Sequence, residues 1–312
     1  MDLRQLRYFI VVAEEGHITR AAERLGMQQP PLSQRIKAIE RKLDVQLFHR
    51  KARGVELTDA GRALFENARV VLAQFDHAIE TTRRTARGEQ GRISVGITPT
   101  SPFHPFVPRL TRAFRQAYPL VSLTLEESFS NELLEHLRNE RIDVAFIRSP
   151  PADPQGLVIN SLLNEELVVA LPNNHVLARS GGRGNAALPM KALARETFII
   201  VGSQYGLGLY AATIAACRAA GFNPKVGQEA SRLASTLNLV AIGLGVSVVP
   251  ASLWRMHVDG VAYRRLKGSA QLKAPLLLTS RRSDPSAVVR QFVNLVKRTA
   301  ESFSVRACPE TK

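Results

Sequence analysis

Residues 19–53 read TRAAERLGMQQPPLSQRIKAIERKLDVQLFHRKAR, and this stretch decides the fold of the N-terminal part of the chain. The pattern predicts a short helix capped by Thr19, a turn at residues 26–28 and a second helix directly after it. The apolar residues of the second helix step by four, three and four, which places them on one buried stripe. They are Leu32, Ile36, Ile39 and Leu43. The order helix, turn, helix is typical of DNA-binding domains.

The face opposite this stripe is polar, basic and free of carboxylates, because successive residues of an α-helix turn by roughly 100°. Such a face suits the major groove, where Gln bonds a base edge and Lys or Arg meets guanine or phosphate. Pro30 and Pro31 fit the first turn, where a missing amide hydrogen costs nothing. The predicted DNA-binding residues, including those of the hairpin that follows, are Thr19, Gln28, Gln29, Pro30, Pro31, Ser33, Gln34, Lys37, Arg41, Arg50 and Arg53.

Residues 45–58, VQLFHRKARGVELT, consist of two short apolar segments around a basic centre and predict a β-hairpin. Gly54 would take the positive φ of its turn. The tip would lay Arg50, Lys51 and Arg53 beside phosphates or in the minor groove, as the wing of a winged helix-turn-helix does. The alternative is a solvated charged helix in an ordinary helical domain. The coincidence of stripe, turn, prolines and basic hairpin favours DNA binding.

Residues 58–88, TDAGRALFENARVVLAQFDHAIETTRRTARG, predict one long helix, capped by Thr58. Its apolar positions alternate steps of four and three, which is a heptad seam. A lone helix has no core to cover such a seam, so pairing with a second chain is expected. The alternative is packing on the chain's own C-terminal domain. The predicted dimerisation residues are Leu64, Ala68, Val71, Phe75 and Ala78.

From residue 90 onward apolar strands alternate with helices, which predicts a βαβαβ unit with a parallel sheet, then a second unit from about residue 165. The expected fold class is α+β overall, in three parts. They are a winged helix-turn-helix DNA-binding domain at residues 1–58, a linker and dimerisation helix at 59–89, and a two-lobed α/β effector-binding domain at 90–312. Lobe I would comprise about residues 90–162 and 267–303, and lobe II about residues 163–266.

Three loops of this C-terminal part follow strands, where open α/β sheets bind ligands. Their hydroxyls and free amides suit a carboxylate, and Arg148 at a strand end could add a salt bridge. For Ser130 the alternative role is a helix N-cap, and for Arg148 it is a surface or interdomain ion pair. The predicted effector-binding residues are Thr98, Thr100, Ser101, Phe103, Ser130, Asn131, Arg148, Gly202 and Ser203.

The net charge of +15 favours an anionic partner such as nucleic acid. Residues 1–90 hold 16 Lys and Arg against 12 Asp and Glu, so most of the excess charge lies in the C-terminal part. The basic cluster from Arg35 to Arg53 is therefore stronger evidence for nucleic-acid binding than the net charge of the chain. Two cysteines, Cys217 and Cys308, imply neither a disulfide framework nor a zinc site and favour a reducing cytoplasm. The uncharged residues 233–254 are interrupted by Gly, Pro and polar residues, which predicts a buried helix, a turn and a strand rather than a membrane span.

Catalytic motifs are missing: there is no GxSxG elbow, HExxH pair, phosphate-binding loop or dinucleotide fingerprint. The scattered histidines show no metal-ligand spacing. We therefore expect neither an enzyme nor a bound metal or cofactor.

The first 90 residues closely resemble the N-terminal domain of the LysR-type transcriptional regulators. The resemblance rests on the QPPLS run, on residues 39–50, which follow the family's LE..L...LF.R pattern with Ile39 in first place, and on the LT.AG ending. The order of elements extends it over the whole chain. Lys42 and Asp44 depart from it, since KLD stands at residues 42–44 where ELG is common. The resemblance implies dimerisation through the long helix, commonly a dimer of dimers, and an effector domain similar to periplasmic binding proteins. By position, Thr100 or Ser101, Ser130 and Ser203 match the inducer-contacting loops of the family.

The function expected from all these features is that of a cytoplasmic transcription factor, with operator DNA, RNA polymerase, itself and a small anionic inducer as partners. The opening MDLRQLRYF and the AFIR strand end resemble the branch that controls breakdown of aromatic compounds, so an aromatic acid or a dicarboxylate is expected. One alternative is a ligand-independent repressor or architectural protein. Another is a solute-binding or enzymatic α/β protein, which would bind no specific DNA sequence.

Overall fold

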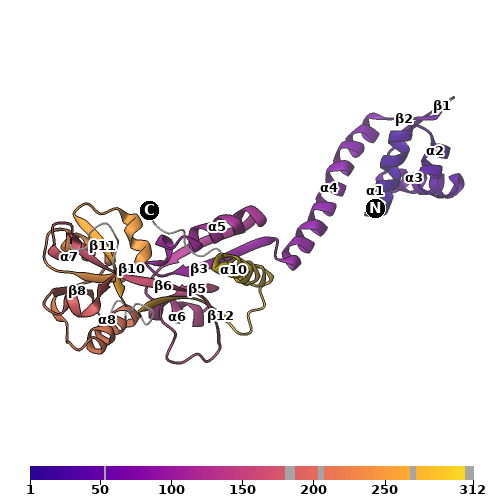
Figure 1. Cartoon of the computed structure of the whole chain (residues 1–312). Helices are drawn as coiled ribbons and strands as arrows, with labels where there is room; N and C mark the ends of the chain where they lie inside the picture. Colours follow the sequence, from indigo (N-terminus) through magenta and orange to yellow (C-terminus); the bar gives the residue numbers. More distant parts are fainter. Residues whose placement is uncertain (53, 180–186, 203–206, 268–271, 306–312) are drawn as a thin grey trace. The chain divides into compact units, whose positions relative to one another are not determined.

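A computed structural model describes residues 1–52, 54–179, 187–202, 207–267 and 272–305 (Figure 1). The chain divides into two compact units, Met1–Arg84 and Thr85–Lys312. The long helix, which the sequence analysis treated as a separate linker, belongs for most of its length to the first unit.

The first unit is helical apart from one hairpin (Figure 1). Its described elements are α1 (Leu3–Glu15), α2 (Ile18–Arg24), α3 (Gln29–Leu43), β1 (Phe48–Lys51), β2 (Gly54–Leu57) and α4 (Asp59–Arg87). Asp2 and Gln5 start α1 with a reciprocal capping box, in which each side chain accepts a hydrogen bond from the other residue's amide. The predicted helix, turn, helix and hairpin are all confirmed.

Two details of this unit differ from the sequence prediction. Thr19 is not the cap of α2, because the helix begins one residue earlier and the Nδ1 atom of His17 accepts a hydrogen bond from the Thr19 amide at 3.2 Å. Leu43 does not complete the buried stripe of α3, since it is 39% exposed while Leu32 and Ile39 are buried. The helix ends directly after it, where Asp44 takes a left-handed conformation with φ of 55°.

The second unit combines one large sheet and one small sheet with helices on their faces (Figure 1). Its described elements are β3 (Gln90–Ile97), η1 (Ser101–Phe103), α5 (Phe106–Ala117), β4 (Leu120–Glu127), α6 (Ser130–Arg138), β5 (Val144–Ile147), β6 (Leu157–Pro172), α7 (Val176–Arg179), β7 (Leu188–Pro189), η2 (Met190–Leu193), β8 (Thr197–Val201), α8 (Leu207–Ala219), β9 (Lys225–Ala230), α9 (Leu233–Ala241), β10 (Ser247–Pro250), η3 (Ala251–Met256), β11 (Val261–Lys267), β12 (Lys273–Arg281) and α10 (Ala287–Val305).

The first lobe is the predicted βαβαβ unit, with β3 parallel to both β4 and β5. Strand β5 alternates its side chains between two cores. Phe146 packs in a cluster with the helices α5 and α10, whereas Ala145 and Ile147 pack on the other face with α6. The predicted return of the chain to this lobe is confirmed, because β12 pairs antiparallel with β5 and α10 packs on α5.

Strand β6 joins the two lobes as one continuous element of 16 residues. The sequence analysis placed only its second half, from residue 165, as a strand. Its first half pairs with β12, and its second half pairs with β10 and β11. In the second half, Val169 packs in one core cluster with β8 and α8, whereas Val168 and Ala170 pack in another with α9.

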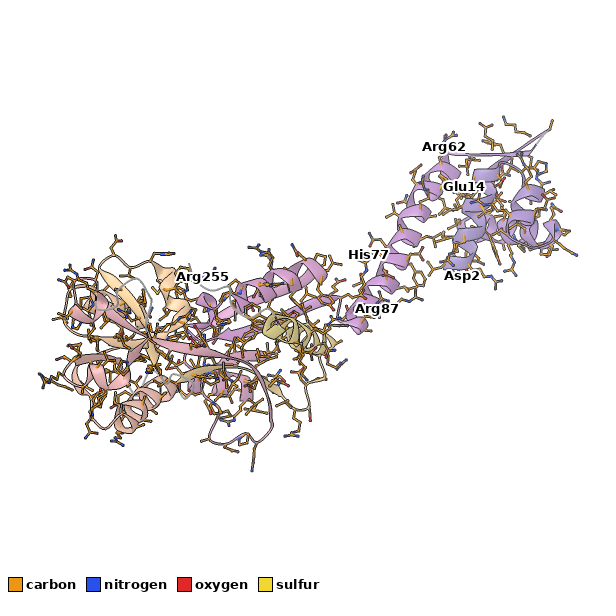
Figure 2. The ribbon with its side chains drawn as sticks, viewed as in Figure 1. Asp2, Glu14, Arg62, His77, Arg87 and Arg255 are labelled. Carbon is orange, nitrogen blue, oxygen red and sulfur yellow. The ribbon has the colours of Figure 1, made fainter. Side chains whose placement is uncertain are left out.

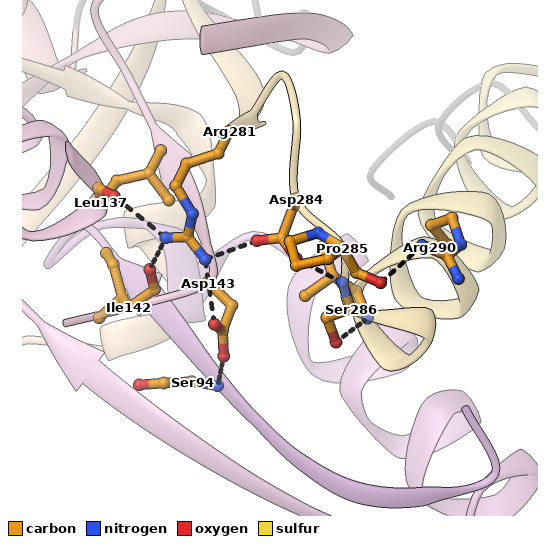
Figure 3. A network of polar contacts seen from close by, with 10 residues as sticks. Ser94, Leu137, Ile142, Asp143, Arg281, Asp284, Pro285, Ser286 and Arg290 are labelled. Carbon is orange, nitrogen blue, oxygen red and sulfur yellow. Dashed lines mark hydrogen bonds and ion pairs between the residues drawn. The ribbon is translucent and has the colours of Figure 1, made fainter. Parts of the chain in front are cut away.

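Arg281, at the end of β12, contacts several neighbouring segments of the first lobe through its guanidinium group (Figure 3). Its Nη1 atom donates to the carbonyl oxygens of Leu137 and Ile142 at 3.0 and 2.6 Å. Its Nη2 atom meets carboxylate oxygens of Asp143 and Asp284 at 3.3 and 2.5 Å. Since the Asp284 side chain is only 6% exposed, its charge depends on this partner.

Replacing Arg281 should therefore destabilise the second unit. Arg281→Met leaves two carboxylates and two carbonyl groups without their donor, and we expect a loss of about 3 kcal/mol in the free energy of unfolding. Urea denaturation followed by circular dichroism measures it. The neighbouring exposed Arg282→Met is the matched control, with an expected change within about 0.5 kcal/mol. Equal stability of the two variants would show that the network contributes nothing.

Candidate nucleic-acid interface and ligand site

The face of α3 that was predicted to bind DNA, called the reading face below, is exposed to solvent. Gln28, Pro30, Pro31, Gln34, Lys37 and Arg41 are exposed, Gln29 and Ser33 are half-buried, and Thr19 is exposed on α2. The two prolines stand in the first turn of the helix, as predicted. A hollow of about 710 Å³ beside this face is lined by Gln34, Lys37 and Arg41 together with Glu40, Asp44, Val45 and Gln46.

Two charged residues of α3 make contacts within their own domain. The guanidinium of Arg35 lies 5.2 Å from the ring centre of Tyr8 on α1, so this cation packs on the domain itself. Glu40 is the acidic residue of the helix, and its Oε1 atom accepts hydrogen bonds from the amides of Leu47 and Phe48 at 2.9 and 3.3 Å. These bonds fix the Glu40 carboxylate against the segment that leads into the hairpin.

The hairpin β1–β2 forms the predicted wing, with Lys51 opposite Gly54 in its register. Gly54 has the predicted positive φ, 139°, and a Cβ there would overlap the carbonyl oxygen of Gly16. The Val55 amide donates to that same carbonyl at 2.9 Å, which anchors the wing on the turn between α1 and α2. Arg50 is exposed on the wing. Arg53 lies outside the described residues.

Helix α4 uses its first half for the core of its own unit, which corrects part of the predicted dimerisation seam. Ala68 is 1% exposed and belongs to the same core cluster as Phe9, and Leu64 is half-buried against that cluster. These two residues therefore stabilise the DNA-binding unit. Further along the helix, Val71 is 45% and Phe75 is 39% exposed. Ala78 is exposed as well.

The first predicted ligand loop, after β3, is tightly packed. Thr98, Thr100 and Ser101 are all buried, and the hydroxyl oxygens of Thr98 and Ser101 are 2.6 Å apart. Phe103 is half-buried and turns toward the second lobe, where it packs against the cluster around Val168 and Leu253. It therefore stands at the junction of the lobes.

Arg148, at the end of β5, brings several predicted residues together. Its amide donates to the Ser130 hydroxyl at 3.2 Å, and its Nε atom donates to the Thr100 hydroxyl at 3.2 Å. Its Nη1 atom lies 3.4 Å from the Ala274 carbonyl. Ser130 is thus not the N-cap of α6, which is Phe129, and its hydroxyl instead fixes the backbone of Arg148.

The charge of Arg148 is met by Glu165 of β6, a residue that the sequence analysis did not single out. Their Nη2 and Oε2 atoms lie 2.8 Å apart, and the two side chains are only 12% and 5% exposed. Both atoms are buried and have no other hydrogen-bond partner, so they meet as a pair of opposite charges. The other oxygen of Glu165 accepts from the Ser252 amide of η3 at 2.6 Å. In the sequence, the feature that could have pointed to Glu165 is an acidic residue inside an otherwise apolar strand.

Burial controls the electrostatics of this cluster. It lowers the pKa of Arg148, against the opposing effect of the Glu165 carboxylate. Burial also lowers the pKa of His104, with Arg148 and Arg255 adding to the effect and Glu165 opposing it. Removing Glu165 would therefore leave a buried guanidinium with an unfavourable desolvation free energy.

The remaining predicted ligand residues are less closely joined to this cluster. Asn131 is exposed on α6. Gly202 is buried and its amide donates to the Ala230 carbonyl, within the second lobe. Ser203 lies outside the described residues. The helix after this third loop does approach the site, because a Cβ on Gly208 would overlap the hydroxyl of Ser149.

Comparisons with known proteins match both units. Residues 3–62 match the bacterial regulatory helix-turn-helix protein family, lysR type, and residues 86–301 match the LysR substrate binding domain. The chain belongs to the LysR family. The transcriptional regulator BudR of Raoultella terrigena is 35% identical over 95% of this chain and 100% of its own, and CatR of Pseudomonas putida is 35% identical over 96% and 100%.

Solved structures of LysR-type regulators share the fold of the whole chain. Full-length CbnR in complex with its target DNA has a TM-score of 0.82 at 31% identity, covering 96% of this chain and 100% of that one. Full-length BenM has a TM-score of 0.61 at 28% identity, covering both chains completely. This protein is therefore a DNA-binding transcriptional regulator with an effector-binding domain and is not an enzyme, as the sequence predicted.

Among the described residues, no group of His, Cys, Asp and Glu could hold a metal ion, and no helix is long and apolar enough to cross a membrane. Residues 233–254 fold into α9, β10 and η3, as predicted. Cys217 is completely buried, and burial raises the pKa of its thiol to about 11, which leaves it protonated and unreactive at neutral pH.

Proposed function

We propose that this LysR-type regulator is switched by a small anionic effector, an aromatic acid or a dicarboxylate, that binds beside Arg148. The observation that carries the proposal is the buried pair of Arg148 and Glu165 at the junction of the lobes. The effector would change the geometry of an oligomer on operator DNA, and with it the access of RNA polymerase.

The proposed ligand is an anion because the polar groups around Arg148 can donate. The Thr100 hydroxyl lies against the guanidinium and the Ser130 hydroxyl against the backbone amide of Arg148, while the Nη2 atom of Arg148 makes no hydrogen bond among the described residues. A ligand carboxylate could accept a hydrogen bond from Nη2, which makes none to Glu165.

Binding at Arg148 would be transmitted through Glu165. The same carboxylate holds the amide of Ser252 at the start of η3, in the second lobe. A ligand that draws Arg148 away from Glu165 changes the charge balance at this hydrogen bond and therefore the position of η3. Trp254, the single tryptophan of the chain, lies in η3 and is 47% exposed. Its fluorescence is thus a built-in reporter of the proposed switch.

The effector proposal is tested by titrating the full-length protein with a panel of aromatic and dicarboxylic acids while following Trp254 fluorescence. We expect one acid to change the signal, and Arg148→Gln to weaken its binding by about tenfold to a hundredfold, since a charge-assisted pair is lost. Arg138→Gln, at the exposed end of α6, is the matched control and should bind normally. Normal binding by the Arg148 variant would refute the site.

The reading face and the wing are proposed to divide the work of DNA binding. Gln34→Ala should relax the preference for one base pair by about 1–3 kcal/mol, because it removes a base contact. Arg50→Ala should weaken binding to all sequences and lower the slope of log affinity against log salt by about one, because it removes a phosphate contact. Fluorescence anisotropy with operator and random duplexes measures both. The exposed Arg83→Ala on α4 controls for the loss of charge, and identical effects of the first two variants would contradict the division.

We further propose that α4 pairs two copies through the exposed apolar residues after its packed first half. Val71, Phe75 and Ala78 continue the heptad spacing, with Val71 and Phe75 substantially exposed in a single chain. Two recognition helices would then read the half-sites of a partly palindromic operator.

The pairing is tested with Phe75→Asp, which puts a charge into the proposed seam without touching the core of the DNA-binding unit. Analytical ultracentrifugation should show this variant shifted toward the monomer, and operator affinity should fall by at least about tenfold because each half-site then binds alone. Gln74→Asp, one residue away and outside the seam, should remain associated. A Phe75 variant with wild-type mass and affinity would exclude pairing through this face.

A further inference from the structure

A second cationic groove lies on the second unit, apart from Arg148. It encloses about 390 Å³ and is lined by Pro102, Phe103, Pro105, Pro108, Arg109, Arg112 and Arg255. Arg255 is labelled in Figure 2, above the bulk of the second unit. All the charged residues of the lining are arginines. The prolines and Phe103 supply an apolar floor. Phe103 is one of the predicted effector-binding residues, but the lining contains none of Thr100, Arg148 and Glu165.

The three guanidinium groups have unused hydrogen-bonding capacity. Arg109, Arg112 and Arg255 are exposed, and among the described residues no carboxylate forms an ion pair with any of them. Arginines elsewhere in this unit do find partners, as Arg138 does with Glu135 and Arg281 with Asp284. Each guanidinium carries five N–H donors in a planar fork that matches the oxygens of a phosphate or carboxylate.

We propose that this groove binds a small polyanion, a metabolite with at least two phosphate or carboxylate groups whose carbon skeleton packs on Phe103 and the prolines. The volume lies within the range of small-molecule sites, which favours a metabolite over a macromolecular partner. Two or three convergent arginines without a competing carboxylate select multiple negative charges over a single one.

The groove is lined by residues of both lobes, so a ligand bound there can influence how the two lobes are arranged. Arg109 and Arg112 stand on α5 of the first lobe, whereas Arg255 stands on η3, directly after β10 of the second. A polyanion bridging them favours the arrangement of lobes in which the arginines converge. The same η3 contains Ser252, whose amide donates to Glu165, so the groove and the Arg148 site are connected through η3.

The test uses the full-length protein with inorganic pyrophosphate and citrate as probes, measured by isothermal titration calorimetry. We expect at least one probe to bind, and the double variant Arg109→Ala/Arg112→Ala and the single variant Arg255→Ala each to weaken that binding by about tenfold or more. The better probe tells whether phosphate or carboxylate is preferred. Arg218→Ala on α8, which removes an exposed charge far from the lining, should bind like the wild type.

Three results would overturn the proposal. Neither probe binds; or all variants, Arg218→Ala included, lose affinity equally, which indicates a general charge effect; or only Arg50→Ala loses binding, which places the polyanion on the DNA-binding wing. Arg148→Gln separates the two ligand sites: if it retains pyrophosphate or citrate affinity while losing its response to aromatic acids, the groove acts as a separate site.

Discussion

Strand β6 hydrogen-bonds and packs in both lobes of the second unit, and this constraint determines how the rest of the unit is arranged. Its first half hydrogen-bonds to β12 and its second half to β10 and β11, so a single extended backbone holds the lobes at a defined spacing. In the second half both faces are buried, with Val169 in one core and Val168 in the other. A strand covered on both sides cannot shift by one residue without exchanging its two cores, which makes its register very stable.

The register of β6 in turn buries Glu165 at the junction of its two halves. A buried carboxylate needs partners, and it obtains Arg148 from β5 and the Ser252 amide from η3. Both atoms of the contact are buried, so a ligand carboxylate that competes for Arg148 changes the environment of two desolvated charges. A desolvated ion pair at the junction of two lobes is well suited to report ligand binding to both.

The DNA-binding unit follows a different logic, because most of its architecture is local. A capping box starts α1, prolines start α3, and the wing turns at Gly54 against the Gly16 carbonyl. The two parts of helix α4 differ in burial: Ala68 packs in the core of the unit, while Val71 and Phe75 remain exposed. The heptad spacing alone could not divide these roles, since the spacing that packs α4 on α1 is also the spacing of a coiled coil.

The sequence by itself determined the helix-turn-helix, the wing, the long helix, the parallel first lobe and the return of the chain through β12, because periodicity, capping and turn residues act over a few neighbours. It also predicted that Thr100, Ser130 and Arg148 lie at one end of the sheet. Only the tertiary structure decided that Glu165 meets Arg148, that His17 caps α2, and that Arg255 faces Arg109 and Arg112 across a groove. These contacts join residues through the packing of separate elements and the register of β6, and no local pattern in a chain specifies where such elements meet.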